Sequence, residues 1–226
     1  MFNLVPVWAK HYEEFWSSMR GRNLWFIKLR YAAVVMLFLF MFFSKYFLGI
    51  AFTASQQKAI IIITISILIY NFLFHFLRKF RKYDADKFNP LHLSVLQMIS
   101  DLIALMLLVY YTGSVESPLL LFFVFHMIVG SLILPGSVIY LFAFLVIASV
   151  WAFTIGEYYS IIQHNHISGY LPISLHQNLN YVLAINISFG FMVFMIVLIA
   201  NRMANQLLNR EQQLLELIDK INIAEK

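Results

Sequence analysis

The sequence has no cysteine and few charged residues. Cysteine is absent from all 226 residues, which excludes disulfide scaffolds, thiolate metal sites and a cysteine nucleophile in this chain. Only 12% of the residues are charged and 62% are apolar, whereas a soluble domain carries about 25% charged residues. The charges gather in a few short stretches and leave long apolar segments between them. This pattern excludes a soluble enzyme and predicts a polytopic helical membrane protein.

Six apolar runs are candidate membrane spans, because a hydrocarbon core of ~30 Å is crossed by about 20 helical residues. Unpaired backbone groups are costly in lipid, so each run is predicted to be a helix and the fold an all-α bundle of six transmembrane helices. The fourth run is the shortest, at 16 residues. The predicted spans are Tyr31–Phe52, Ala59–Leu77, Leu93–Tyr111, Leu119–Leu134, Val138–Tyr159 and Leu179–Ala200.

Basic residues predict the orientation of these spans. Of the 16 Lys and Arg residues, 14, Arg30 among them, precede the first span, separate the second and third, or follow the sixth. Only Lys45 and Lys58 fall on the other side. Because cytoplasmic loops are enriched in Lys and Arg, both termini are predicted to lie in the cytoplasm. The net charge of +5 then gives no reason to expect nucleic acid as a partner.

The charge pattern divides the chain into three parts. Residues 1–28 are predicted to form an amphipathic helix that lies in the membrane interface and stops near Gly21. One face of this helix carries an aromatic stripe of Trp8, Tyr12, Phe15, Trp16 and Met19. An alternative is that this stripe packs on a cytoplasmic domain. Residues 29–200 are predicted to form the six-helix transmembrane domain.

Residues 201–226 are polar but contain no Gly or Pro, and they predict a cytoplasmic helical stalk. An apolar seam with steps of about 3.5 residues indicates the start of a dimerisation coil, so a homodimer through this stalk is expected. The sequence stops without a helix cap, which suggests that the stalk continues; a frayed surface helix is the alternative. The seam residues are Leu207, Leu214, Ile218 and Ile221.

Two ionisable residues fall near the middle of predicted spans, where they are costly and usually functional. Asp101 lies in the third span and His126 in the fourth. The two spans form a hairpin, so the residues are expected at depths that differ by about one helical turn. A hydrogen-bonded pair between Asp101 and His126 is predicted, and a bond from Asp101 to a serine or a backbone carbonyl is the alternative.

The turn between the third and fourth spans is a candidate ligand site on the outer side. Gly113 supplies backbone freedom and Pro118 begins the next helix, so the turn is short and rigid. A lipophilic head group could reach its backbone donors, although aromatic belts at membrane edges also occur without a ligand. The candidate ligand residues are Tyr110, Tyr111, Gly113, Glu116, Pro118 and Phe122.

The longer outer loop contains three histidines, His164, His166 and His176. A His-x-His pair can join a zinc or copper site, but a metal needs further fixed ligands. The loop is expected to be flexible, with no Cys or Asp nearby, so no metal site is predicted. The chain also contains no phosphate-binding loop, nucleophile elbow or H-E-x-x-H motif, and therefore no catalytic domain is expected.

The stretch from Asp101 to Leu120, which contains Gly113 and Pro118 and is followed by His126, resembles the sensor region of RegB-type histidine kinases. That family has six membrane helices, a dimerisation helix with the phosphorylated histidine, and an ATP-binding domain. Its outer loop carries a G-G-x-x-N-P-F heptapeptide implicated in quinone sensing. Gly113 and Pro118 match this heptapeptide, whereas three other positions differ: Ser114, Ser117 and Leu119.

The resemblance implies a signal-input module of a two-component sensor kinase in the inner membrane of a bacterium, with a quinone or similar amphiphile as the sensed ligand. The kinase core, and through it the response regulator, would lie outside this chain. Two other classes remain open, a small multi-pass transporter and a membrane scaffold protein. The first is disfavoured by the lack of an internal repeat between spans one to three and four to six.

Overall fold

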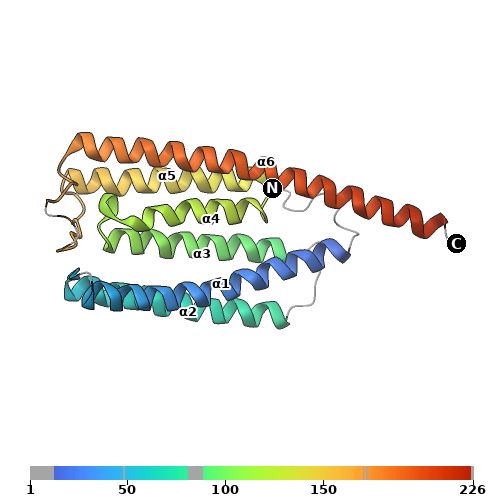
Figure 1. The fold of residues 1–226 in the computed structure, drawn as a ribbon, viewed down its shortest axis with the longest axis horizontal. Helices are drawn as coiled ribbons and strands as arrows, with labels where there is room; N and C mark the ends of the chain where they lie inside the picture. Colours follow the sequence, from blue (N-terminus) through green and yellow to red (C-terminus); the bar gives the residue numbers. More distant parts are fainter. Residues whose placement is uncertain (1–12, 48, 81–88, 170, 172, 225–226) are drawn as a thin grey trace.

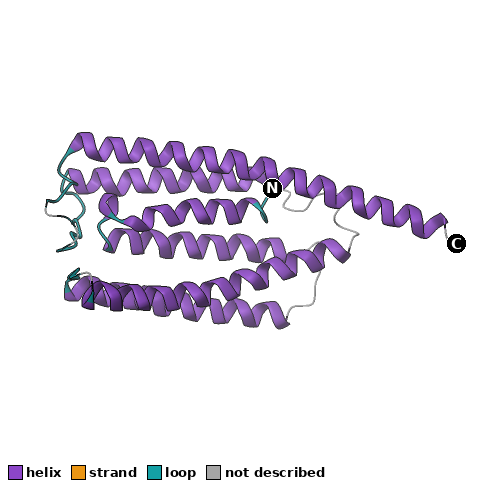
Figure 2. Cartoon of the chain, viewed as in Figure 1, coloured by secondary structure: helices purple, strands orange, loops and turns teal. Residues whose placement is uncertain are grey.

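A computed structural model describes residues 13–47, 49–80, 89–169, 171 and 173–224 (Figure 1). The predicted all-α fold is confirmed, because these residues form helices and no strand beyond one isolated bridge between Ala51 and Ser168 (Figure 2). Two short 3-10 turns, Ser114–Glu116 and Pro118–Leu120, join α3 to α4. The six helices are α1 (Glu13–Tyr46), α2 (Ala54–Phe80), α3 (Pro90–Tyr111), α4 (Leu121–Ser131), α5 (Gly136–Tyr158) and α6 (Leu179–Ala224).

Five helices, α1, α2, α3, α5 and α6, are long and apolar enough to cross a membrane, with mean hydropathy between 2.0 and 2.6. Their outer faces carry large apolar side chains, such as Phe72 (68% exposed) and Phe191 (68% exposed), which suit lipid and not water. The chain is therefore a helical membrane protein. The prediction of six full spans is only partly met, because α4 has 11 residues, fewer than the ~20 that a span needs.

The helices lie side by side in three groups (Figure 1). The pair α1–α2 forms one side, the pair α5–α6 forms the other, and α3 and α4 lie between them. One hydrophobic cluster contains residues of α3, α4, α5 and α6 and is centred on the fully buried Phe123, Met127 and Ile139. A second cluster joins α1, α2 and α3 around Val34 and Ile60. Since α3 belongs to both clusters, it connects the two halves of the bundle.

The predicted boundary between an interfacial helix and the first span is absent, because α1 runs as one helix through Gly21. Residues 1–12 of the predicted interfacial helix lie outside the described residues. Trp16 and Met19 are each only 2% exposed, so they pack inside the protein instead of facing the membrane interface. Burial of two such side chains contributes ~1.5–3 kcal/mol each, which outweighs the ~1 kcal/mol cost of a glycine inside a helix.

Helix α6 is the longest element, with 46 residues, and its C-terminal part extends beyond the rest of the bundle (Figure 1). One face of its N-terminal half packs against the bundle, where Val182, Val193 and Val197 are 0% exposed. The predicted stalk is thus helical and continuous with the last span. The four predicted seam residues are 52–61% exposed in a single copy of the chain: Leu207, Leu214, Ile218 and Ile221.

Candidate functional site

A buried ion pair joins α1 to α3 in the middle of the bundle. Arg30 Nη2 donates to Asp101 Oδ2 at 2.7 Å, and Arg30 Nε donates to both carboxylate oxygens, at 2.8 Å and 3.0 Å. The side chains are only 9% and 14% exposed. The prediction that Arg30 flanks the first span is wrong, because its side chain is buried within the bundle. Arg30 lies inside the bundle, because an aspartate at this depth needs a cation close by to remain charged.

Three polar side chains surround the ion pair. Tyr70 Oη donates to Asp101 Oδ1 at 2.8 Å. Arg30 Nη1 donates to Asn71 Oδ1 at 3.5 Å, and Arg30 Nη2 donates to Gln97 Oε1 at 3.4 Å. Tyr70 and Asn71 belong to α2 and Gln97 to α3, so the network ties three helices together. Such a network restricts how these helices can slide past one another.

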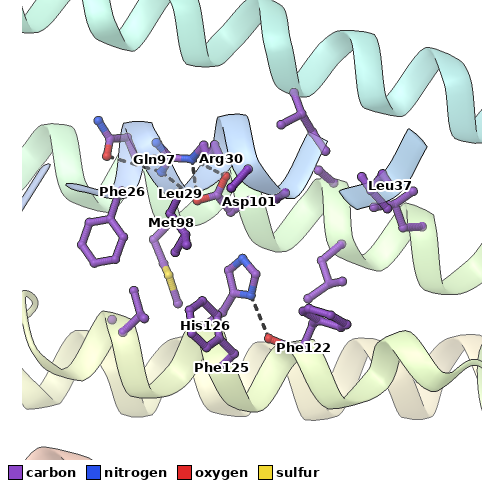
Figure 3. A pocket seen from close by; sticks show the side chains of 18 of the residues that line it. Phe26, Leu29, Arg30, Leu37, Gln97, Met98, Asp101, Phe122, Phe125 and His126 are labelled. Atoms are coloured by element: carbon purple, nitrogen blue, oxygen red, sulfur yellow. Dashed lines mark hydrogen bonds and ion pairs between the residues drawn. The ribbon is translucent and has the colours of Figure 1, made fainter. Parts of the chain in front are cut away.

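The predicted hydrogen bond between Asp101 and His126 is replaced by other contacts. Asp101 accepts from Arg30 and Tyr70, whereas His126 Nδ1 lies 2.8 Å from the carbonyl oxygen of Phe122, one turn earlier in α4. Figure 3 shows the two predicted partners on opposite walls of one cavity. Both residues line this cavity, but a shared cavity does not bring their side chains into contact. The rule that a buried charge needs a partner points to the basic residues near the first span, Arg30 among them, but does not select one of them.

The cavity has a volume of about 550 Å³ and is bounded mainly by α1, α3 and α4 (Figure 3). Its walls are mostly apolar, and its polar lining includes Arg30, Asp101 and His126. Two residues at its edge, Met36 (65% exposed) and Phe122 (53% exposed), indicate that it opens to the surface of the bundle. An amphiphile with an apolar tail and a small polar head group matches this lining.

The structure divides the predicted ligand residues into two sets. Pro118 and Phe122 line the cavity. The others lie toward the loop end of the bundle, which is the end that carries the α1–α2, α3–α4 and α5–α6 connections (Figure 1). The second set consists of Tyr110, Tyr111, Gly113 and Glu116.

The turn itself has the expected rigid conformation. Gly113 adopts φ +101°, a left-handed conformation that favours glycine, and Pro118 occupies the first turn of the following 3-10 helix. The Ser117 hydroxyl lies 2.6 Å from the Thr112 hydroxyl and closes the turn. Glu116 is 8% exposed and points into the protein, so this turn does not present it to a ligand in the cavity.

Two glutamates and two histidines meet at the loop end. We refer to Glu116, Glu157, His164 and His166 as the loop-end cluster. His164 Nδ1 lies 3.0 Å from Glu157 Oε2, and His164 Nε2 lies 3.5 Å from Glu116 Oε2. His166 Nδ1 lies 3.3 Å from the same Glu116 oxygen. The Glu116 and Glu157 side chains are 3% and 0% exposed, so two carboxylates are buried beside imidazoles.

Hydrogen bonds fix described parts of the loop that carries the histidines, whereas a flexible loop was expected. Gln56 Nε2 of α2 donates to the carbonyl oxygens of Asn165 and His166, at 3.1 Å and 3.2 Å. The backbone of Leu175 donates to Glu116 Oε1 at 2.5 Å. Sequence reasoning missed the cluster because Glu116 lies 48 residues before His164.

The surroundings shift the pKa values of two loop histidines in opposite directions. Burial acts to lower the pKa of His164, but the hydrogen bond and charge of Glu157, with the charge of Glu116, raise it above the ordinary value. Burial lowers the pKa of His176, and its stacking on the His164 ring, at 3.9 Å between centroids, adds a repulsive charge. The cluster therefore favours a cation at His164 and disfavours one at His176.

Comparisons with protein-family models, with curated proteins and with solved structures find no match for this chain. The resemblance to RegB-type kinases thus stays a prediction from the residues quoted above.

Proposed function

We propose that the chain is the signal-input module of a bacterial membrane sensor kinase. The observation that carries the proposal is the continuity of α6, which is buried in the bundle at Val193 and projects from it as an exposed apolar helix at Leu214. A single helix with these two environments transmits a shift in bundle packing directly to whatever binds its far end. The proposal includes cytoplasmic termini, an inner-membrane location and a homodimer through the stalk. A response regulator is reached through a kinase core outside this chain.

The cavity is the proposed ligand site. Its apolar walls and its opening between α1 and α4 suit a lipophilic molecule that enters from the bilayer, and a quinone or quinol has the required ring, tail and polar oxygens. When His126 Nδ1–H donates to the Phe122 carbonyl, the neutral imidazole offers Nε2 as an acceptor. A quinol hydroxyl can donate to that nitrogen, whereas a quinone carbonyl cannot. This difference provides a way to distinguish the two redox states.

The path from the cavity to the stalk runs through α4. Phe122 and His126 line the cavity on one side of α4. On the other side, Phe123 of the same helix packs edge-to-face on Phe189 of α6, with 5.9 Å between ring centroids. A ligand that moves α4 therefore moves the helix that continues into the stalk.

Disulfide crosslinking tests the proposal, because the chain has no native cysteine. Leu214→Cys and Ile218→Cys in native membranes are expected to crosslink strongly, with Gln213→Cys as the control on a different face of the helix. Oxidised and reduced ubiquinone analogues are expected to change the ratio of crosslinking at positions 214 and 218. Equal crosslinking at position 213, or no ligand effect in any variant, would contradict the proposal.

The gene downstream of codon 226 provides a second test. A segment with a phosphorylatable histidine followed by an ATP-binding domain is expected there. A downstream region with neither would favour the small multi-pass transporter, to which the buried Arg30–Asp101 pair beside an intramembrane cavity also lends support. Substrate uptake into proteoliposomes would then be the measurement.

A further inference from the structure

One ring nitrogen of the loop-end cluster is buried without a hydrogen-bond partner. His164 Nε2 is buried and has no hydrogen-bond partner, while the side chain as a whole is only 6% exposed. This nitrogen lies 3.5 Å from Glu116 Oε2, which in turn lies 3.3 Å from His166 Nδ1. The three atoms all lie within 4.8 Å of one another. A buried polar atom without a partner is costly, so its position in a group of three possible ligand atoms calls for an explanation.

The spacing of these atoms fits a small cation. Zinc binds imidazole nitrogen and carboxylate oxygen at ~2.0–2.2 Å in a tetrahedral arrangement, which places neighbouring ligand atoms about 3.3 Å apart. The two distances that involve Glu116 Oε2, 3.3 Å and 3.5 Å, are close to that value. Only small side-chain movements are needed to bring all three atoms around one ion.

The groups behind the ligand atoms hold them in the orientation that a metal needs. Glu157 Oε2 lies 3.0 Å from His164 Nδ1, and Ser114 Oγ donates to Glu157 Oε1 at 2.6 Å. A carboxylate on Nδ1 keeps a proton there, so a metal that displaces the proton of Nε2 meets a lone pair directed toward the site, which is the usual arrangement behind a metal-bound histidine. The Leu175 N–H binds Glu116 Oε1 and leaves Oε2 for the ion.

The charge balance of the cluster also favours a bound cation. The ion-pair partners of the buried Glu116 and Glu157 carboxylates are histidines. Buried charges in proteins are paired or coordinate a metal. A divalent ion would balance both carboxylates at once, whereas a protonated His164 balances only one of them.

We propose that Glu116, His164 and His166 bind a divalent transition-metal ion, with Zn²⁺ the best fit. Two imidazoles and one carboxylate form a three-ligand set that leaves a further coordination position for water. The site fixes the α5–α6 loop to the α3–α4 turn at one end of the bundle (Figure 1). The proposal is independent of the proposed sensor function.

Metal titration of the purified full chain in detergent tests the proposal. After treatment with a chelator, the protein is titrated with ZnCl₂ in a calorimeter, and one Zn²⁺ per chain is expected. His166→Ala is the main variant, because the His166 side chain is 35% exposed and its loss should leave the fold intact, as checked by circular dichroism. It is expected to weaken binding by more than tenfold. His75→Ala removes an exposed histidine of α2 and serves as the matched control, with affinity equal to wild type.

Two further measurements separate a metal site from a histidine–carboxylate pair. Glu157→Gln keeps the acceptor on His164 Nδ1 but removes its charge, and a loss of about 10–100-fold in affinity is expected, as for other carboxylates behind a metal-bound histidine. X-ray absorption of the zinc-loaded protein should show two imidazoles, and one in His166→Ala. No saturable binding by wild type, or equal binding by wild type and His166→Ala, would overturn the proposal and leave only a buried pair.

Discussion

Removal of the Asp101 carboxylate is expected to be among the most damaging single changes in the bundle. Asp101→Leu leaves the Arg30 guanidinium, whose side chain is 9% exposed, without the partner that accepts its three shortest hydrogen bonds. Breaking a buried ion pair from one side costs about 3–5 kcal/mol. Loss of one neutral hydrogen bond between membrane helices costs only about 0.6–1.7 kcal/mol. The size of the destabilisation therefore distinguishes a broken ion pair from the loss of one neutral hydrogen bond.

A double-mutant cycle isolates the contribution of the pair. Arg30→Met and Asp101→Leu are each expected to lower the free energy of unfolding by ~3–5 kcal/mol, whereas the double variant should lie within ~1–2 kcal/mol of wild type, because no charge remains buried. Tyr70→Phe removes one hydrogen bond to the same carboxylate and should cost about 1 kcal/mol. Ser100→Ala is the matched control, since Ser100 is next to Asp101 and, among the described residues, its hydroxyl donates to the Leu96 carbonyl of its own helix.

The free energies are measured by reversible unfolding in mixed micelles with increasing SDS, followed by circular dichroism. Each ~1.4 kcal/mol changes the folding equilibrium tenfold, so the single variants should differ from wild type by a factor of at least ~10². If the double variant is as unstable as the sum of the single variants, the two charges do not interact. If Asp101→Leu alone is neutral, the carboxylate faces lipid head groups or water and not Arg30.

Three smaller effects are expected, each measured by thermal or SDS unfolding in detergent. Gly130→Ala should destabilise by ~1–3 kcal/mol, because a Cβ there would lie 2.5 Å from Ile139 Cδ1; a higher melting temperature would contradict this. Asn186→Ala should cost ~0.6–1.7 kcal/mol, since Asn186 Nδ2 donates to Thr154 Oγ1 across α5 and α6 at 2.8 Å; an unchanged stability would show that the bond is not net stabilising. Gly113→Ala should cost ~1–2 kcal/mol because of its positive φ; a neutral result would mean that the turn relaxes.

Hydropathy along the chain was sufficient to find the five long apolar helices, but not their exact ends. Long apolar runs must become helices in lipid because no other local structure satisfies their backbone groups, and this requirement holds whatever the neighbours are. The continuity of the last span with the stalk was likewise predictable, because residues 201–224 contain no Gly or Pro to end the helix. The end of the first helix near Gly21 was wrongly predicted, since the packing of Trp16 and Met19 overrides a weak local signal.

The sequence by itself therefore determined the fold class, the long helices and the presence of an aspartate within a span. Tertiary structure alone decided that Asp101 meets Arg30 and Tyr70, and that Glu116 meets His164 and His166. The physical reason is that hydropathy is a property of each segment, whereas a polar contact depends on how two helices are rotated and placed against each other. A helix that is apolar on every side, as α5 largely is, gives no sequence signal for that rotation, so its partners are fixed only when the bundle packs.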